Sequence, residues 1–373
     1  MIDIAPYLAS RRLSVEKAAA KAGLSPERFE QVTGGAKATL SEVRGIAKAL
    51  KVPVSSLIEN PSAEPVRLLF RRTLGQRPAE TTPQLDVISV QIHDALIVAN
   101  ELRSDLSWLR AFHDLEPTLS NAEAFAKRFR ANFAGIDDRE PFPNVSQVLS
   151  DLGVLVLLSR DPTVEGVSAI VDGHAFVIAA ARSFMPRMLF TIAHELGHLV
   201  AHHSSTGGES FAHIDEKIGA LNSPRQNEEK FADGFASALL LPRTGVLEAL
   251  KAIREKLQIS HMPLGAIEIA WIAHIFYVSF EVAARRFESL DLLTPNGARA
   301  FYQKLEDDFG NPEKFAASID IPPRPDLSID SSPVLLQAVA RKVRAGDLSL
   351  GKAADLLNVP ISALVVANAD ISV

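Results

Sequence analysis

The chain has 373 residues, a length that favours two or three domains. Of these residues 47% are hydrophobic and 23% charged, which predicts a globular protein with an ample core. Its formal net charge is −6 at pH 7, and it contains no cysteine, which excludes disulfides, cysteine zinc ligands and a cysteine nucleophile. The start shows no basic stretch followed by an apolar core, and no apolar run is as long as a membrane span, so we expect a cytoplasmic protein with no membrane segment.

Residues 1–62 are predicted to form a first, helical domain. Short helical patterns occupy residues 13–22, 25–32 and 40–50. Gly23 separates the first two, and Ser25-Pro26 is typical of an N-cap followed by proline in the first helical turn. The spacing L-S-x-x-x-A-A-x-x-A-G-L-S in this stretch resembles the Xre-type helix-turn-helix. The resemblance implies that the second helix enters the major groove of DNA.

Three polar residues of that second helix are candidates for contacts with DNA bases, namely Arg28, Gln31 and Thr33. Residues 1–60 hold nine Lys or Arg and six Asp or Glu, a net charge of +3 on a chain that is acidic elsewhere. We therefore expect duplex DNA as a partner of this segment. Glu27 and Glu30 in the same helix would repel phosphates, so a helix-turn-helix that docks onto protein is the alternative.

Residues 63–119 are predicted to be a helical connector. The stretch 60–82 is rich in Pro, Arg and Glu and is typical of a solvated linker, while residues 85–115 show an amphipathic helical pattern. Such a helix could also form a dimer interface, so the sequence is compatible with a dimer and leaves the oligomeric state open.

Residues 120–290 are predicted to form a domain with both helices and strands. Helices are expected at residues 122–133 and 145–152, a buried strand at residues 153–158, and a β-hairpin formed by residues 167–171 and 175–180. We interpret His174, in the turn of that hairpin, as a surface histidine.

Residues 187–203 contain His194-Glu195-Leu196-Gly197-His198, the H-E-x-x-H pattern of a helix-borne zinc site. At roughly 100° per residue, His194 and His198 lie on one helix face and can hold one cation from consecutive turns. Glu195 borders the same site without being a ligand and could accept a proton from an attacking water, as zinc-dependent peptide hydrolysis requires. His202 continues this face, and we expect it to border the site as a supporting residue.

A two-histidine site needs a third ligand and keeps its fourth position for water. Residues 228–242 show another helical pattern, in which Glu229 and Asp233 share a face. We predict Glu229 as the third ligand, with Glu228 as the alternative, and Asp233 as the acceptor of an imidazole N–H. Taken alone, these acids would be read as a solvated helix face, and the first motif reverses that interpretation.

Three motifs together resemble the ImmA/IrrE metallopeptidases. They are F-T-I-A-H-E-L-G-H-L-V-A-H at residues 190–202, E-x-x-A-x-x-F-A-x-x-L-L-x-P at residues 229–242 and F-Y-V-S-x-x-V-A-x-R-R at residues 276–286. The resemblance covers roughly residues 120–290 and implies a gluzincin-like zinc peptidase that cleaves a helix-turn-helix repressor. In zinc peptidases of this type, an edge strand beside the metal helix can bind the substrate backbone as a further strand. The resemblance also implies His194, His198 and Glu229 as ligands and Glu195 as the base. A metzincin would need glycine and histidine where the chain has Ala201 and Ser204.

The remaining segments are predicted to support this domain. Residues 204–226 are polar and are expected to be a loop or lid, and helical patterns return at residues 246–257, 267–276 and 280–290. Residues 291–373 form a C-terminal helical region with a proline-rich linker at residues 311–333. Its last part repeats the spacing of residues 13–26, and we interpret it as a packing or protein-interaction element, with a second, abbreviated helix-turn-helix as the alternative.

The sequence therefore predicts an α+β fold, a mostly helical multidomain chain in which the peptidase core holds a small β-sheet. The predicted function is that of a zinc-dependent, site-specific endopeptidase with Zn²⁺ as cofactor. Its expected substrate is a helix-turn-helix repressor in a stress-response, mobile-element or toxin–antitoxin setting. The alternative is a DNA-binding regulator or antitoxin whose zinc site is not catalytic, although a purely structural site would not require Glu195.

Overall fold

The computed structural model describes residues 8, 13–50, 54, 83–102, 104–159, 164–206, 211–215, 227–362 and 364, with residues 83–86, 202–206 and 211–215 described by their backbone alone. The helices are α2 (Val15–Ala22), α3 (Pro26–Thr33), α4 (Leu40–Leu50), α7 (Pro83–Ala99), α8 (Ala122–Phe129), α9 (Val145–Asp151), α10 (Met185–Thr206), α11 (Asn227–Leu240), α12 (Arg243–Lys256), α13 (Ala266–Ile275), α14 (Phe280–Ser289), α15 (Gly297–Phe309), α16 (Pro312–Ser318), α17 (Pro333–Ala345) and α18 (Leu350–Leu357). Short 3₁₀ segments are η1 (Ser107–Phe112) and η2 (Leu119–Asn121), and η3 (Arg130–Ala134) is a π-helical turn.

One small mixed sheet lies at the centre of the fold. Its strands are β1 (Val154–Ser159), β2 (Gly166–Val171), β3 (His174–Ala180) and β4 (Phe211–Asp215), in the order β1-β3-β2-β4. β1 runs parallel to β3, and the other two pairs are antiparallel. Asp172 and Gly173 have φ angles of 50° and 78°, as a tight two-residue hairpin turn requires. The predicted hairpin and the α+β class are confirmed.

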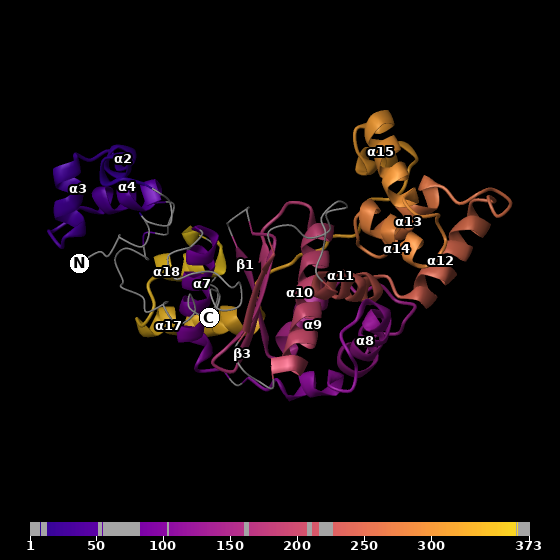
Figure 1. The fold of residues 1–373 in the computed structure, drawn as a ribbon, viewed down its shortest axis with the longest axis horizontal. Helices are drawn as coiled ribbons and strands as arrows, with labels where there is room; N and C mark the ends of the chain where they lie inside the picture. Colours follow the sequence, from indigo (N-terminus) through magenta and orange to yellow (C-terminus); the bar gives the residue numbers. More distant parts are fainter. Residues whose placement is uncertain are drawn as a thin grey trace.

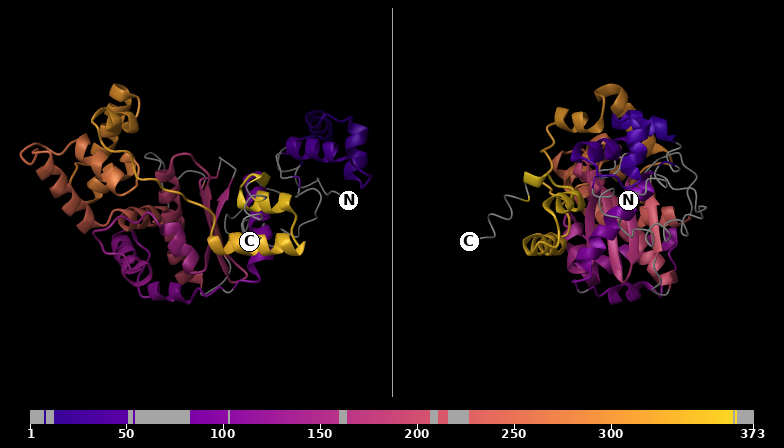
Figure 2. Two further views of the ribbon diagram at one scale, coloured as in Figure 1. Left: turned by 180° about the vertical axis from the view of Figure 1, so that it is seen from behind. Right: turned by 90° about the vertical axis from the view of Figure 1, so that its left-hand side faces the viewer.

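Both faces of the sheet are covered by helices. α10 packs on one face, and α7, α17 and α18 lie on the other (Figure 1). Figure 2 shows from behind that the yellow C-terminal helices and the purple α7 lie on the same side of the sheet. Strands buried on both faces need apolar side chains at nearly every position, which explains the continuous apolar runs in the sequence. Segments that precede and follow the strands in the sequence therefore complete the second core.

Three sequence predictions are wrong in part. The helix expected over residues 85–115 ends at Ala99, because the chain turns there toward η1, which packs beside α10. The loop expected over residues 204–226 contains the last turn of α10 and strand β4, because pairing with β2 overrides its polar composition. The linker expected over residues 311–333 contains α16, which has proline in its first turn.

The N-terminal helices α2, α3 and α4 form their own apolar core. Gly23 ends α2 with a φ of 72°, and the Ser25 hydroxyl accepts the backbone N–H of Arg28 at 3.2 Å to begin α3. Gly45 of α4 lies so close to the end of α2 that a Cβ built on it would be 2.4 Å from the carbonyl oxygen of Ala22. These local contacts confirm the predicted helices, the tight turn between α2 and α3 and the N-cap.

The C-terminal repeat of this spacing adopts the same caps in a different setting. Ser349 begins α18 and accepts the backbone N–H of Lys352, and Asn358 ends the helix with a φ of 56°. Here the lysine lies 3.2 Å from Asp94 of α7, and both side chains are largely buried. The packing alternative for this segment is confirmed.

No single helix in the described ranges is long and apolar enough to cross a membrane. One helix pair of the described part, α13 and α14 with a bend of 109° between them, satisfies such a test by length and composition alone.

Candidate metal centre

Helices α10 and α11 pack closely at a glycine of the H-E-x-x-H motif. A Cβ built on Gly197 would lie 3.0 Å from the Cα atom of Ala232 and 3.2 Å from the ring of Phe235. Glycine removes this obstacle, so the two helix backbones can approach. Glu229 lies one turn before Ala232, and the close approach therefore brings it to the histidines on either side of Gly197.

Three side chains converge at this contact. His194, His198 and Glu229 each offer one ligand atom, and these atoms all lie within 4.8 Å of one another. The two Nε2 atoms are 3.1 Å apart, and the carboxylate oxygens of Glu229 lie 3.5 Å from His194 Nε2 and 3.4 Å from His198 Nε2. Both histidines are buried, and the glutamate is partly buried. The structure brings the three predicted ligands together.

These separations suit one metal ion. Bonds of about 2.0–2.1 Å, as zinc forms with nitrogen and oxygen, place two tetrahedral ligands roughly 3.3–3.4 Å apart. The two Nε2 atoms are 3.1 Å apart, and each lies 3.4–3.5 Å from a different carboxylate oxygen of Glu229, separations that are near this length. Two imidazoles and one carboxylate from the described residues also leave a fourth position of such a tetrahedron for water or substrate.

Asp233 fixes one of the imidazoles from behind. Its Oδ1 atom lies 3.0 Å from Nδ1 of His194. A carboxylate accepts hydrogen bonds, so this contact assigns the ring proton to Nδ1 and leaves the lone pair on Nε2, which points to the other two ligands. The structure thus places Asp233 where the sequence predicted it.

Glu195 lies beside the cluster with its side chain fully buried. It is held against strand β2, where a Cβ on Gly166 would come within 2.1 Å of its Oε1 atom. A buried carboxylate is stabilised in its charged form by a neighbouring cation, so the position suits a metal ion at the three ligands.

Other predicted residues stand apart from the cluster or outside the described side chains. Glu228 is exposed and is not in the three-residue cluster. His174 is only 8% exposed, and burial lowers its pKa, so its interpretation as a surface histidine was wrong. His174 is the first residue of strand β3, which is buried along its whole length. The backbone of His202 belongs to α10, but its side chain lies outside the described part.

The three N-terminal candidates differ in their contacts. Arg28 donates to Glu42 at 2.7 Å and to the carbonyl oxygen of Lys37 at 3.0 Å. The hydrogen bond from Arg28 is the largest cause that lowers the pKa of Glu42 to about 2, so this carboxylate stays charged in any ordinary buffer. The Thr33 hydroxyl donates to the backbone of its own helix, while Gln31 is exposed.

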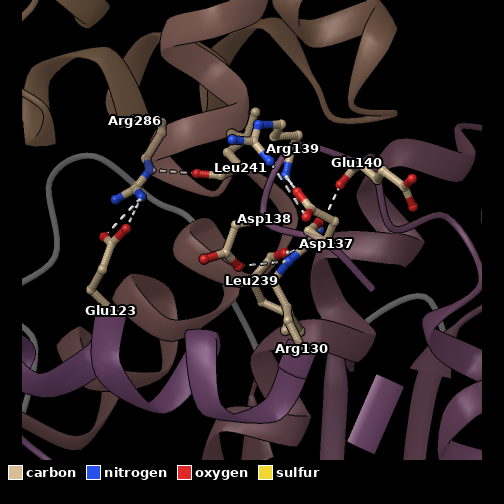
Figure 3. A network of polar contacts seen from close by, with 9 residues as sticks. All are labelled: Glu123, Arg130, Asp137, Asp138, Arg139, Glu140, Leu239, Leu241 and Arg286. Atoms are coloured by element: carbon tan, nitrogen blue, oxygen red, sulfur yellow. Dashed lines mark hydrogen bonds and ion pairs between the residues drawn. The ribbon is translucent and has the colours of Figure 1, made fainter. Parts of the chain in front are cut away.

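Two arginines that the sequence analysis did not single out bind the C-terminal end of α11 (Figure 3). Arg130 is fully buried and donates to the carbonyl oxygen of Leu239 at 2.8 Å. Arg286 donates to the carbonyl oxygen of Leu241 at 2.8 Å and forms two hydrogen bonds with Glu123. Cations at this end satisfy the last carbonyl groups and complement the helix dipole.

This arginine pair fixes the helix that carries Glu229 and Asp233. Arg286 closes the third motif, F-Y-V-S-x-x-V-A-x-R-R, so that motif gave a signal for it, whereas nothing local marks Arg130. The long separation along the chain, 109 residues between Arg130 and Leu239, makes the contact invisible to helical periodicity.

The H-E-x-x-H helix, the carboxylate helix packed on it and the mixed sheet beside them together define a site of the metallopeptidase type. Residues 150–288 match the Peptidase_M78 family model, described as the IrrE N-terminal-like domain. This match supports the ImmA/IrrE resemblance for that segment, which contains the candidate metal centre, and indicates a peptidase. A comparison with curated proteins found no match.

Proposed function

We propose that the chain is a zinc-dependent endopeptidase that regulates transcription by cleaving a helix-turn-helix repressor. The observation that carries the proposal is the convergence of His194, His198 and Glu229, whose ligand atoms lie within 4.8 Å of one another, with the buried Glu195 next to His194 on the same helix. Two imidazoles and one carboxylate are a common ligand set of catalytic zinc. A structural zinc site has four protein ligands and no need of a base, whereas the described residues offer three.

The reaction follows from what the side chains can do. When bound, zinc would polarise the scissile carbonyl group and make an attacking water more acidic. Glu195 accepts the proton of that water and later donates it to the leaving amine. Asp233 keeps His194 in the tautomer and orientation that a ligand needs. The arginines at the end of α11 hold Glu229 in place during this cycle.

Among the strands that the structure describes, β4 ends the sheet on the side away from β1. At β1, the outer edge is occupied by Ser332, whose backbone N–H donates to the Val156 carbonyl oxygen at 2.9 Å and whose hydroxyl accepts the Val156 N–H at 2.7 Å. β4 is the last strand at the opposite end and is the neighbour of β2, against which Glu195 lies. We infer that an extended substrate segment pairs with β4.

The target is inferred from the flanking modules and the family match. A short zinc cleft selects substrates weakly, so specificity would come from a second binding site on the same chain. We propose that α2–α4 form a helix-turn-helix that supplies it, either on a repressor or on the repressor's DNA. The alternative is a regulator or antitoxin that acts by binding DNA or protein through this module and whose metal is not catalytic.

Removing residues 1–60 is expected to separate recognition from chemistry. Cleavage of the true repressor should become slower by about 100-fold or more, because the second binding site and its effective concentration are lost. Hydrolysis of a short peptide that spans the cut site should stay nearly unchanged. Both rates are measured by mass spectrometry. Degradation of an unrelated protein such as casein by the intact chain would contradict a specific peptidase.

Release of Arg28 is expected to strengthen DNA binding. The Glu42→Gln variant removes the charged partner that holds this arginine, so affinity for duplex DNA should rise and the log–log salt slope should become steeper by about 0.9, the value of one added phosphate contact. Fluorescence anisotropy of the full chain at several salt concentrations measures both. Glu16→Gln on α2 makes the same charge change and serves as the control. If neither variant nor the native chain binds duplex DNA at low salt, the DNA-binding proposal fails and the protein-docking alternative is favoured.

A further inference from the structure

Strand β2 begins with a glycine that lies directly against the Glu195 carboxylate. A Cβ built on Gly166 would lie 2.1 Å from Oε1, 2.8 Å from Cδ and 3.0 Å from Cγ of Glu195. Real Cβ atoms essentially never come closer than 3.0 Å to a heavy atom of a residue that is not their neighbour in the chain. Any other residue at position 166 would therefore displace the carboxylate.

The backbone gives no reason for glycine at this position. Gly166 is not among the glycines with positive φ, and it pairs with Ala179 on one side and Asp215 on the other as an ordinary strand residue. Glycine inside a strand weakens it, and its usual justification is the close approach of another group. Here that group is the carboxylate of Glu195.

The residue before Gly166 ties this strand to α10. Glu165 is 7% exposed and accepts hydrogen bonds from Arg187 of α10, one of them at 2.6 Å, and from Arg182 at 3.0 Å. Its carbonyl oxygen also accepts the N–H of Ala180 at the end of β3. These contacts fix the start of β2 against the first turn of α10, so the gap beside Gly166 has a fixed width.

We propose, on the basis of the peptidase function proposed above, that Gly166 is a positioning residue for the general base. The missing side chain leaves a notch in the sheet that receives the Glu195 carboxylate and sets its distance from the metal ligands. An added methyl group would meet the far end of a flexible side chain, so the carboxylate would move while the fold and the three ligands stay. A misplacement of about 1 Å is enough to slow such a reaction by roughly 100-fold.

Gly166→Ala tests the notch directly in the full, zinc-loaded chain. We expect kcat on a cleaved peptide to fall by roughly 100-fold, with KM and zinc affinity unchanged. Gly351→Ala on α18 adds the same methyl group where nothing lies within 4 Å, and it should leave all three quantities unchanged. The shorter carboxylate of Glu195→Asp should slow the native chain but restore part of the rate in the Gly166→Ala background.

A second readout does not depend on activity. In the Glu195→Ala background the carboxylate is absent, so Gly166→Ala should raise the melting temperature by removing a strand glycine. In the background with intact Glu195, the same substitution should raise the melting temperature less or lower it. Equal shifts of the melting temperature in both backgrounds, or full activity of Gly166→Ala, would overturn the positioning role of Gly166 and leave the proposed peptidase function intact. If the shifts differ as expected but the native chain cleaves no peptide, the peptidase function fails and the positioning role fails with it.

Discussion

Glu195→Gln is expected to abolish hydrolysis while the metal stays bound. Glutamine keeps the size of the side chain, so it fits beside Gly166, but it cannot accept the proton of an attacking water. Removing a general base of this kind lowers kcat by roughly 10²–10⁴-fold. Zinc content should stay at one per chain, since Glu195 is not in the ligand cluster. Peptide hydrolysis and elemental analysis of the same sample measure both quantities.

A charge-matched control shows whether the effect belongs to this carboxylate. Glu228→Gln removes an exposed negative charge that is not in the ligand cluster, and it should leave kcat within about twofold of the native value. Hydrolysis by Glu195→Gln at the native rate would eliminate Glu195 as the base. Loss of zinc from this variant would instead make Glu195 a ligand.

Glu229→Ala is expected to remove the metal. The substitution takes away one of three protein donors, and the two remaining imidazoles form an incomplete site. A ligand that binds only the folded chain stabilises it by about 2.7 kcal/mol at a concentration of 100 times Kd. Added zinc should therefore raise the melting temperature of the native chain and have little effect on Glu229→Ala. Glu228→Ala should respond to zinc as the native chain does.

The two glutamates also allow a clear contradiction. If Glu229→Ala, with Glu228 intact, is purified with one zinc per chain, the assignment of Glu229 as the ligand is wrong. The structure favours Glu229 because its oxygens lie 3.4 and 3.5 Å from the two Nε2 atoms, whereas Glu228 is outside the cluster.

The parts of the site that could be predicted from sequence are those that depend on local geometry. His194 and His198 are four residues apart on one helix, so helical spacing alone brings their rings together. The caps at Ser25 and Ser349 are predictable for the same reason, since each side chain accepts a backbone N–H three residues further along. The assignment of Glu229 needed the additional assumption that two helices pack.

The parts that could not be predicted depend on contacts between distant segments. Gly166 lies 29 residues before Glu195 and looks like an ordinary strand residue until the strand is placed against α10. Arg130 binds a helix end more than a hundred residues away. Strand β4 is a short stretch inside a polar segment, and it forms a strand because β2 offers it a partner. Sequence periodicity contains no information on such pairings.

The covering of the sheet is another case of this kind. α7 and α18 are separated by most of the chain, but they share the second face of the sheet and the buried ion pair between Asp94 and Lys352. Each helix has an apolar face that the sequence shows clearly. Which element each face would cover could not be inferred, since any apolar face satisfies the pattern.

The most direct test is an intact-mass measurement on a repressor. Zinc-loaded native chain and Glu195→Gln are each incubated with candidate helix-turn-helix repressors from the same cell, and the products are weighed by mass spectrometry. A site-specific peptidase predicts that one repressor yields a single pair of fragments whose masses add up to the repressor plus one water, and only with the native chain. The proposed peptidase function would be contradicted if the zinc-loaded chain cut no repressor and no spanning peptide, or if the native chain and Glu195→Gln gave the same fragments.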